Sequence, residues 1–199
     1  MTTPLTKARA VMRRRSAVRS KELTAAGIAR MHLSRLTAAG KLVRVARGLY
    51  ALPNRKPGTQ EGLAVVTQRM PHALFCLLTA LRLHELTTVA PFEVWIAIGN
   101  KERAPKSEWP PMRIVRYSGA ALKSGIETRT VAGARIRVTT VAKTVADCFK
   151  FRRTVGIDVA RDALREALRG KRATVDDLWK FAKVCRVTKV MRPYLDAFA

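Results

Sequence analysis

The fold is decided by SKELTAAGIARMHLSRLTAAGKLVRVARGLYAL, residues 20–52. Ser20 has the side chain of a helix N-cap, and a short helix is predicted over residues 21–26. Gly27 follows as a residue that tolerates the left-handed conformation and ends that helix. A second helix is predicted to begin at once and to end at Gly40. The stretch therefore begins as two short helices separated by a glycine turn.

After Gly40 the helical spacing gives way to an apolar pattern typical of strands, with a tight turn at Arg47-Gly48. A further helix is predicted upstream, with Thr3 as N-cap and Pro4 in the first helical position, running to about Arg14. Three helices followed by a β-hairpin predict a winged helix-turn-helix domain.

The second helix of the stretch has two different faces. At about 100° per residue, one arc contains Ala29, Leu33, Leu36 and Gly40. The opposite arc contains Arg30, Met31, Ser34, Arg35 and Ala38. We expect the first arc to pack and the second to remain free.

In a helix-turn-helix, the N-terminal part of the second helix meets base edges in the major groove. Arg30, Met31 and Ser34 are therefore the predicted base readers, with Arg30 the most important because arginine can bond guanine through two hydrogen bonds. Arg35 lies further along the helix, where phosphate is the alternative contact.

The hairpin provides the second predicted DNA contact. Arg44 and Arg47 place positive charge on it, and Gly48 next to Arg47 is free to adopt a positive φ. We expect this wing to lie along phosphate or the minor groove.

Charge favours an anionic partner. The 199 residues contain 39 Lys and Arg against 14 Asp and Glu, a formal net charge of +25. Residues 1–56 hold 14 of these basic residues and one acid, a net charge of +13. A hydrophobic fraction of 48% nevertheless predicts a folded chain. Nucleic acid is the partner that best offsets such an excess, because bound Lys and Arg release condensed counterions.

The turn-rich segment at residues 53–58 predicts a boundary between a domain at 1–56 and a domain at 57–199. The second domain is expected to be α+β and to end in several helices. Its predicted strands are 92–98, 113–117, 127–131 and 136–140. Its predicted helices are 60–70, 80–86 with Thr79 as N-cap, 141–151, 157–169, 175–184 and 190–198, the fifth of these with a capping box at Thr174 and Asp177.

The residues of the second domain do not form a recognisable catalytic motif. Asp158, Asp162 and Glu166 alternate with arginines at helical spacing, which is typical of a solvated helix with ion pairs. Asp147 follows Lys143 by four residues, and the pattern leaves open whether they form a surface pair or a buried anchor. We expect no enzyme activity, no cofactor and no metal site.

Basic residues gather around the predicted second hairpin: Lys123, Arg129, Arg135 and Arg137, with Arg113 and Arg116 extending the group. They are compatible with a second nucleic-acid surface and equally with the exposed face of a packed α+β domain. The three cysteines, Cys76, Cys148 and Cys185, stand singly and are expected to be buried free thiols. With no apolar run long enough to span a membrane and no sign of a secretory signal, a cytoplasmic location is expected.

Two runs resemble the AbiEi-type (type IV) antitoxin and transcriptional-regulator family: GIARMHLSRL at residues 27–36 and GKLVRVARGLYALP at residues 40–53. Three segments of the second domain are also similar to that family, at residues 79–87, 91–98 and 141–149. Ala29 departs from the Ser or Thr expected as N-cap of the reading helix. Removing such a cap weakens a helix end by about 0.5–2 kcal/mol.

The resemblance implies an N-terminal winged helix that binds inverted repeats in its own promoter as an autoregulatory repressor, which allows self-association on double-stranded DNA. It also implies a C-terminal domain that counters a nucleotidyltransferase-type toxin without a stable complex being necessary. The alternative hypothesis is a non-enzymatic RNA-binding or toxin-sequestering protein.

Overall fold

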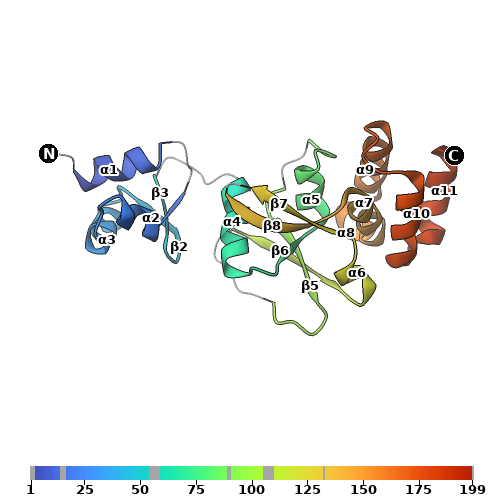
Figure 1. Cartoon of the computed structure of the whole chain (residues 1–199), viewed down its shortest axis with the longest axis horizontal. Helices are drawn as coiled ribbons and strands as arrows, with labels where there is room; N and C mark the ends of the chain where they lie inside the picture. The colour runs from blue at the N-terminus through green and yellow to red at the C-terminus, as the bar shows by residue number, and fades with distance from the viewer. Residues whose placement is uncertain are drawn as a thin grey trace. The chain divides into compact units, whose positions relative to one another are not determined.

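The computed structural model describes residues 3–13, 17–53, 59–88, 91–104, 110–131 and 133–198. The chain forms two compact units, Met1–Gly62 and Leu63–Ala199. The fold is mixed α+β, and each unit has its own sheet (Figure 1). Within the described residues, no helix combines the length and apolar character that crossing a bilayer requires.

The first unit consists of short helices and a small sheet. Its elements are α1 Pro4–Val11, β1 Val18–Arg19, α2 Ser20–Ala25, α3 Arg30–Ala38, β2 Val43–Ala46 and β3 Leu49–Ala51. The sheet is antiparallel in the order β1-β3-β2. All three helices and the sheet contribute to one apolar cluster: Ala8, Met12, Val18, Leu23, Ile28, Leu33 and Leu42. This shared core makes the hairpin and the helices one structural body.

The helix starts of this unit confirm one sequence prediction and correct another. Thr3 is the N-cap of α1, where its side chain accepts a hydrogen bond from the amide of Thr6, and Pro4 opens the helix. Ser20, by contrast, is the first residue of α2, and the N-cap is Arg19, which makes no side-chain cap bond. The amide of Ser20 donates instead to the carbonyl of Gly48 at 2.8 Å. Helix α2 therefore begins at Ser20, one residue earlier than the sequence predicts, and the amide of its first residue is bonded to the hairpin turn.

The second unit is a five-stranded mixed sheet with helices. Its strands are β4 Leu74–Phe75, β5 Val94–Gly99, β6 Met112–Tyr117, β7 Ile126–Val131 and β8 Ala134–Thr139, in the order β6-β5-β4-β8-β7. Helix α4 Thr59–Arg69 begins before the boundary between the units and continues into the second. The other helices of the second unit are α5 Leu77–Leu83, α6 Ala120–Lys123, α7 Val141–Lys150, α8 Arg152–Val155, α9 Ile157–Arg169, α10 Val175–Val184 and α11 Thr188–Leu195, followed by a 3-10 turn at Asp196–Phe198. The pairs β5–β6 and β4–β8 are parallel, whereas β4–β5 and β7–β8 are antiparallel.

Both faces of this sheet are covered. On β5, Trp95 and Ala97 belong to a large cluster with residues of α5, α7, α9, α10 and α11. Val94, Ile96 and Ile98 of the same strand belong to a second cluster that includes Leu63 and Val66 of α4. Successive residues of a strand point to opposite faces, so β5 is buried along its whole length. In Figure 1 the C-terminal helices α7 and α9 to α11 gather at one end of the sheet.

One predicted cap in the second unit is wrong. The sequence predicts Thr79 as N-cap of a helix at 80–86, but α5 begins at Leu77 with Cys76 as N-cap. The hydroxyl of Thr79 is buried and accepts a hydrogen bond from the amide of Trp95 at 2.8 Å. Thr79 therefore attaches α5 to the sheet instead of starting the helix.

Candidate nucleic-acid interface

The predicted base readers share the exposed side of α3. Arg30 is the first residue of the helix, and Arg30, Met31, Ser34 and Arg35 are all exposed. Their spacing places them side by side on one helical face. Met31, the apolar member of the group, is 55% exposed. This face is therefore available to a partner.

The opposite side of α3 packs less completely than the sequence predicts. Leu33 is buried and Leu36 is half-buried against the core. Ala29 and Gly40, which the same arc contains, are exposed because they lie beyond the two ends of the helix. The buried residue at the start is instead Ile28, whose amide donates to the carbonyl of Leu23.

The start of α3 carries no side-chain cap. Ala29 is the N-cap, with extended backbone angles and no side-chain hydrogen bond, as its methyl group requires. The first amides of a helix without such a cap remain open to another acceptor, and Arg30 lies at that end.

The turn between β2 and β3 is fixed to the helices of the same unit. Gly48 has a φ of +74°, in the region that favours glycine. Its carbonyl is the acceptor for the amide of Ser20, at 2.8 Å. Arg47 beside it and Arg44 on β2 are both exposed. The turn thus presents two cations on a backbone that is hydrogen-bonded to α2.

In the second unit, most of the basic residues around the hairpin make internal contacts. Arg116 Nη1 donates to the carbonyls of Gly99, Asn100 and Glu102 at 2.6–3.0 Å. Arg129 pairs with Glu127 and donates to the carbonyl of Leu83. The sequence left open whether these basic residues form a second nucleic-acid surface or the exposed face of a packed α+β domain. At Arg116 and Arg129 the internal contacts favour the packed domain.

The acidic residues of α9 occupy the positions expected of a solvated helix. Asp158 and Asp162 are exposed, and each pairs with the arginine three residues later, at 3.3 and 3.7 Å. Cys76, Cys148 and Cys185 are buried free thiols, as the sequence predicts. Burial raises the pKa of each thiol, and a buried thiol with a raised pKa is unreactive.

Lys143 and Asp147 of α7 form a buried ion pair, which resolves the choice left open by the sequence. Their side chains are 0% and 2% exposed, and Lys143 Nζ lies 2.6 Å from both carboxylate oxygens of Asp147. The thiol of Cys185 donates to Asp147 Oδ1 at 3.2 Å, and the Lys143 ammonium lies 4.4 Å from the centre of the Tyr117 ring. Burial raises the pKa of Asp147, while the ammonium of Lys143 opposes that shift.

The first unit thus combines short helices, a hairpin, and exposed cations on α3 and on the hairpin. Residues 8–53 match the family described as "Transcriptional regulator, AbiEi antitoxin". This match covers the two runs at residues 27–36 and 40–53 and confirms the resemblance seen there in the sequence.

A solved structure supports the fold of the chain more widely. It is titled "Crystal structure of RV2827C protein from Mycobacterium tuberculosis", and it is 14% identical to this chain with a TM-score of 0.60. The alignment covers 90% of this chain and 71% of that chain. At this identity the likeness concerns the fold alone. A search of curated proteins gave no match.

Proposed function

We propose that the first unit is a winged helix-turn-helix that binds double-stranded DNA, with α3 as the recognition helix and the β2–β3 turn as the wing. The observation that carries the proposal is the joint exposure of Arg30, Met31, Ser34 and Arg35 on a helix that follows a glycine turn. A helix-turn-helix needs this arrangement, since its second helix enters the major groove by its N-terminal part. The net charge of +13 on residues 1–56 supports the same partner.

The readers and the wing have different roles in this proposal. Arg30 bonds a guanine edge, Met31 contacts a thymine methyl, and Ser34 bonds a neighbouring base. Arg35, Arg44 and Arg47 contact phosphate, and Gly48 allows the wing to approach the DNA backbone closely.

The regulator family further supports an antitoxin that represses its own operon in the cytoplasm. In this proposal the winged helix reads inverted repeats in the promoter, and the second unit counters a nucleotidyltransferase-type toxin encoded beside it. Growth of cells that express this toxin, with and without residues 57–199, tests the second part. Survival only with those residues supports it, and recovery of toxin and chain as one stable complex would favour sequestration instead.

A gel-shift titration of the full chain tests the DNA-binding part. Duplex from the region upstream of its own gene is compared with random duplex of equal length at about 150 mM salt. We expect clear preference for the upstream duplex, and equal affinity would refute the repressor proposal.

Single variants separate the two contact types. Arg30→Ala should reduce the preference for the upstream duplex by about tenfold, because a bidentate arginine–guanine pair discriminates by about 1–3 kcal/mol. Arg47→Ala should weaken binding to both duplexes equally, and it should reduce by about one the slope of log affinity against log salt concentration. Arg153→Ala, which removes one exposed charge from the second unit, is the control. It should leave both the preference for the upstream duplex and the salt slope unchanged.

A further inference from the structure

The sheet of the second unit has a gap at its centre. Strand β4 has only two residues, and Leu74 pairs with Ala97 of β5 on one side and with Arg137 of β8 on the other. Strand β5 continues past Ala97 to Gly99, while β8 begins three residues before Arg137. Because β5 runs antiparallel to β4 and β8 runs parallel to it, both extensions project beyond β4 at the same end. The middle of the sheet therefore lacks a strand at this end.

A pocket of about 560 Å³ occupies this position. Its apolar wall includes Leu74, which belongs to the core cluster with α7, and Leu122 of α6, which packs against that cluster. It also includes Met70 and Ile98, from the cluster on the other face. The pocket thus reaches into the sheet between its two cores. Its volume lies within the range of small-molecule sites, which is about 300–1,000 Å³.

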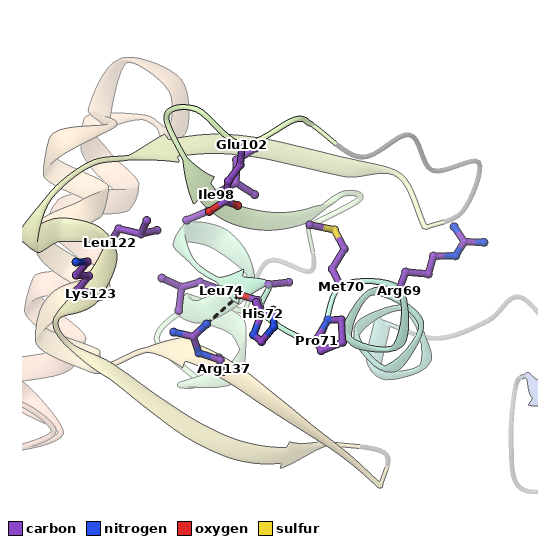
Figure 2. Close-up of a pocket in the computed structure, with 12 residues that line it drawn as sticks. Arg69, Met70, Pro71, His72, Leu74, Ile98, Glu102, Leu122, Lys123 and Arg137 are labelled. Atoms are coloured by element: carbon purple, nitrogen blue, oxygen red, sulfur yellow. Dashed lines mark hydrogen bonds between the residues drawn. The ribbon is translucent and has the colours of Figure 1, made fainter.

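The rim of the pocket is basic. Arg69, Lys123 and Arg137 line it together with His72, and Glu102 is the one acidic residue among the described side chains that line it. Figure 2 shows Lys123 and Arg137 towards one end of the pocket and Arg69 towards the other. The two cations at one end, Lys123 and Arg137, favour an anionic ligand there.

The Arg137 side chain and the turn that carries Glu102 are both held in place by hydrogen bonds. Arg137 Nη1 donates to the carbonyl of His72 at 3.0 Å (Figure 2), and the guanidinium has five N–H donors in a planar fork that suits phosphate. On the opposite wall, the carbonyls of Gly99, Asn100 and Glu102 all accept from Arg116. The site is therefore built on strands and on a tied turn, which preserves its shape without a ligand.

We propose that this pocket binds a small organic phosphate of the nucleoside-phosphate class. Its phosphate lies between Lys123 and Arg137, and its base lies on the apolar wall of Met70, Ile98 and Leu122. A pocket of this volume takes a mononucleotide, whereas a duplex is too wide to enter it. The inference goes beyond the DNA-binding role proposed for the first unit and does not depend on it.

Isothermal titration of the full chain tests the proposal, with AMP, ADP and GTP as probes. Adenosine, inorganic phosphate and a 5′-phosphorylated single-stranded oligonucleotide serve as comparisons. At least one nucleotide should bind more tightly than adenosine and than inorganic phosphate, because each of those lacks half of the recognised chemistry. Oligonucleotide binding that Lys123→Ala weakens as much as it weakens nucleotide binding would overturn the proposal in favour of a nucleic-acid surface, and absence of nucleotide binding at millimolar concentration would also overturn it.

Variants locate the site. Lys123→Ala should weaken nucleotide binding by about tenfold, the loss expected for one charge-assisted hydrogen bond. Lys123 is exposed at the end of a four-residue helix, so its removal should leave the fold intact, and an unchanged melting temperature checks this. Arg137→Ala should weaken binding as well. Arg135→Ala is the matched control, since Arg135 is exposed on the same strand but does not line the pocket. Equal affinity of the Lys123 variant and the control would overturn the proposal.

Discussion

Replacement of Asp147 by alanine should destabilise the second unit by about 3–5 kcal/mol, the cost of leaving one charge of a buried pair unpaired. The magnitude follows from the geometry: Lys143 is 0% exposed, and its ammonium has both carboxylate oxygens of Asp147 at 2.6 Å. Without this carboxylate a buried cation remains. For a unit of this size, the loss corresponds to a fall of roughly 10–15 °C in the melting temperature.

Urea denaturation followed by tryptophan fluorescence measures this effect. The three tryptophans of the chain all lie between residues 95 and 179, so the signal reports on the second unit. The control is the double variant Lys143→Met with Asp147→Val, which removes both charges and should lie within about 1–2 kcal/mol of the natural chain, since apolar replacement of buried pairs is often neutral. A loss below about 1 kcal/mol for Asp147→Ala, or a double variant as unstable as the single one, would refute the reasoning.

The same pair predicts a pH dependence. In Lys143→Met, Asp147 stays buried without its cation, and burial raises its pKa. The folded state then binds a proton more readily than the unfolded state, so stability falls as pH rises through the folded-state pKa. The deficit of Lys143→Met relative to the natural chain should therefore shrink as pH is lowered from neutral, and a constant deficit would contradict this account.

Two further predictions concern single positions in the second unit. Gly125→Ala should lower the free energy of unfolding by about 1–3 kcal/mol through overpacking, because the φ of Gly125 is +64° and a Cβ there would lie 2.5 Å from the Phe181 ring. Gly133 has a φ of +77° and nothing within 4 Å of an added Cβ. Gly133→Ala therefore shares the backbone strain without the clash and should lower the free energy of unfolding less in the same urea assay. Asp177→Asn should reduce stability at neutral pH, since the hydrogen bonds from Thr174 lower the pKa of Asp177. The Asp177 carboxylate therefore stabilises the fold at pH values above its pKa in the unfolded chain. The difference in stability between Asp177→Asn and the natural chain should vanish as pH falls through about 4 and below. A difference in stability that persists at pH 2 would contradict the cap assignment.

Long, strongly amphipathic helices could be predicted closely from the sequence. Helices α9 and α10 begin and end where their patterns predict, Ile157–Arg169 and Val175–Val184. The capping box at Thr174 and Asp177 is also confirmed. In these segments local preference and tertiary packing specify the same structure, which is why the prediction succeeds.

The shortest elements could not be predicted. Strands β1 and β4 have two residues each, too few for any alternation of apolar and polar residues to be seen. They exist because β3 and the pair β5 and β8 supply their hydrogen-bond partners. The pocket beside β4 was missed for the same reason, since it results from where that strand stops.

The exposed face of α3 and the buried pair of Lys143 and Asp147 differ in how well the sequence predicts them. The exposed face of α3 follows from helical spacing alone. The burial of Lys143 and Asp147 does not, because spacing of four residues is also typical of surface pairs. Every residue from Ala142 to Phe149 is buried, and the apolar residues around the pair were the signal that could have indicated this.

The most direct test of the central claim is an NMR titration of the full chain with duplex from its own upstream region, followed through backbone amide shifts. The account predicts that the largest changes fall on residues 30–35 of α3 and residues 44–48 of the hairpin, with small changes over residues 63–198. Changes that concentrate in the second unit and leave residues 30–35 unaffected would contradict it.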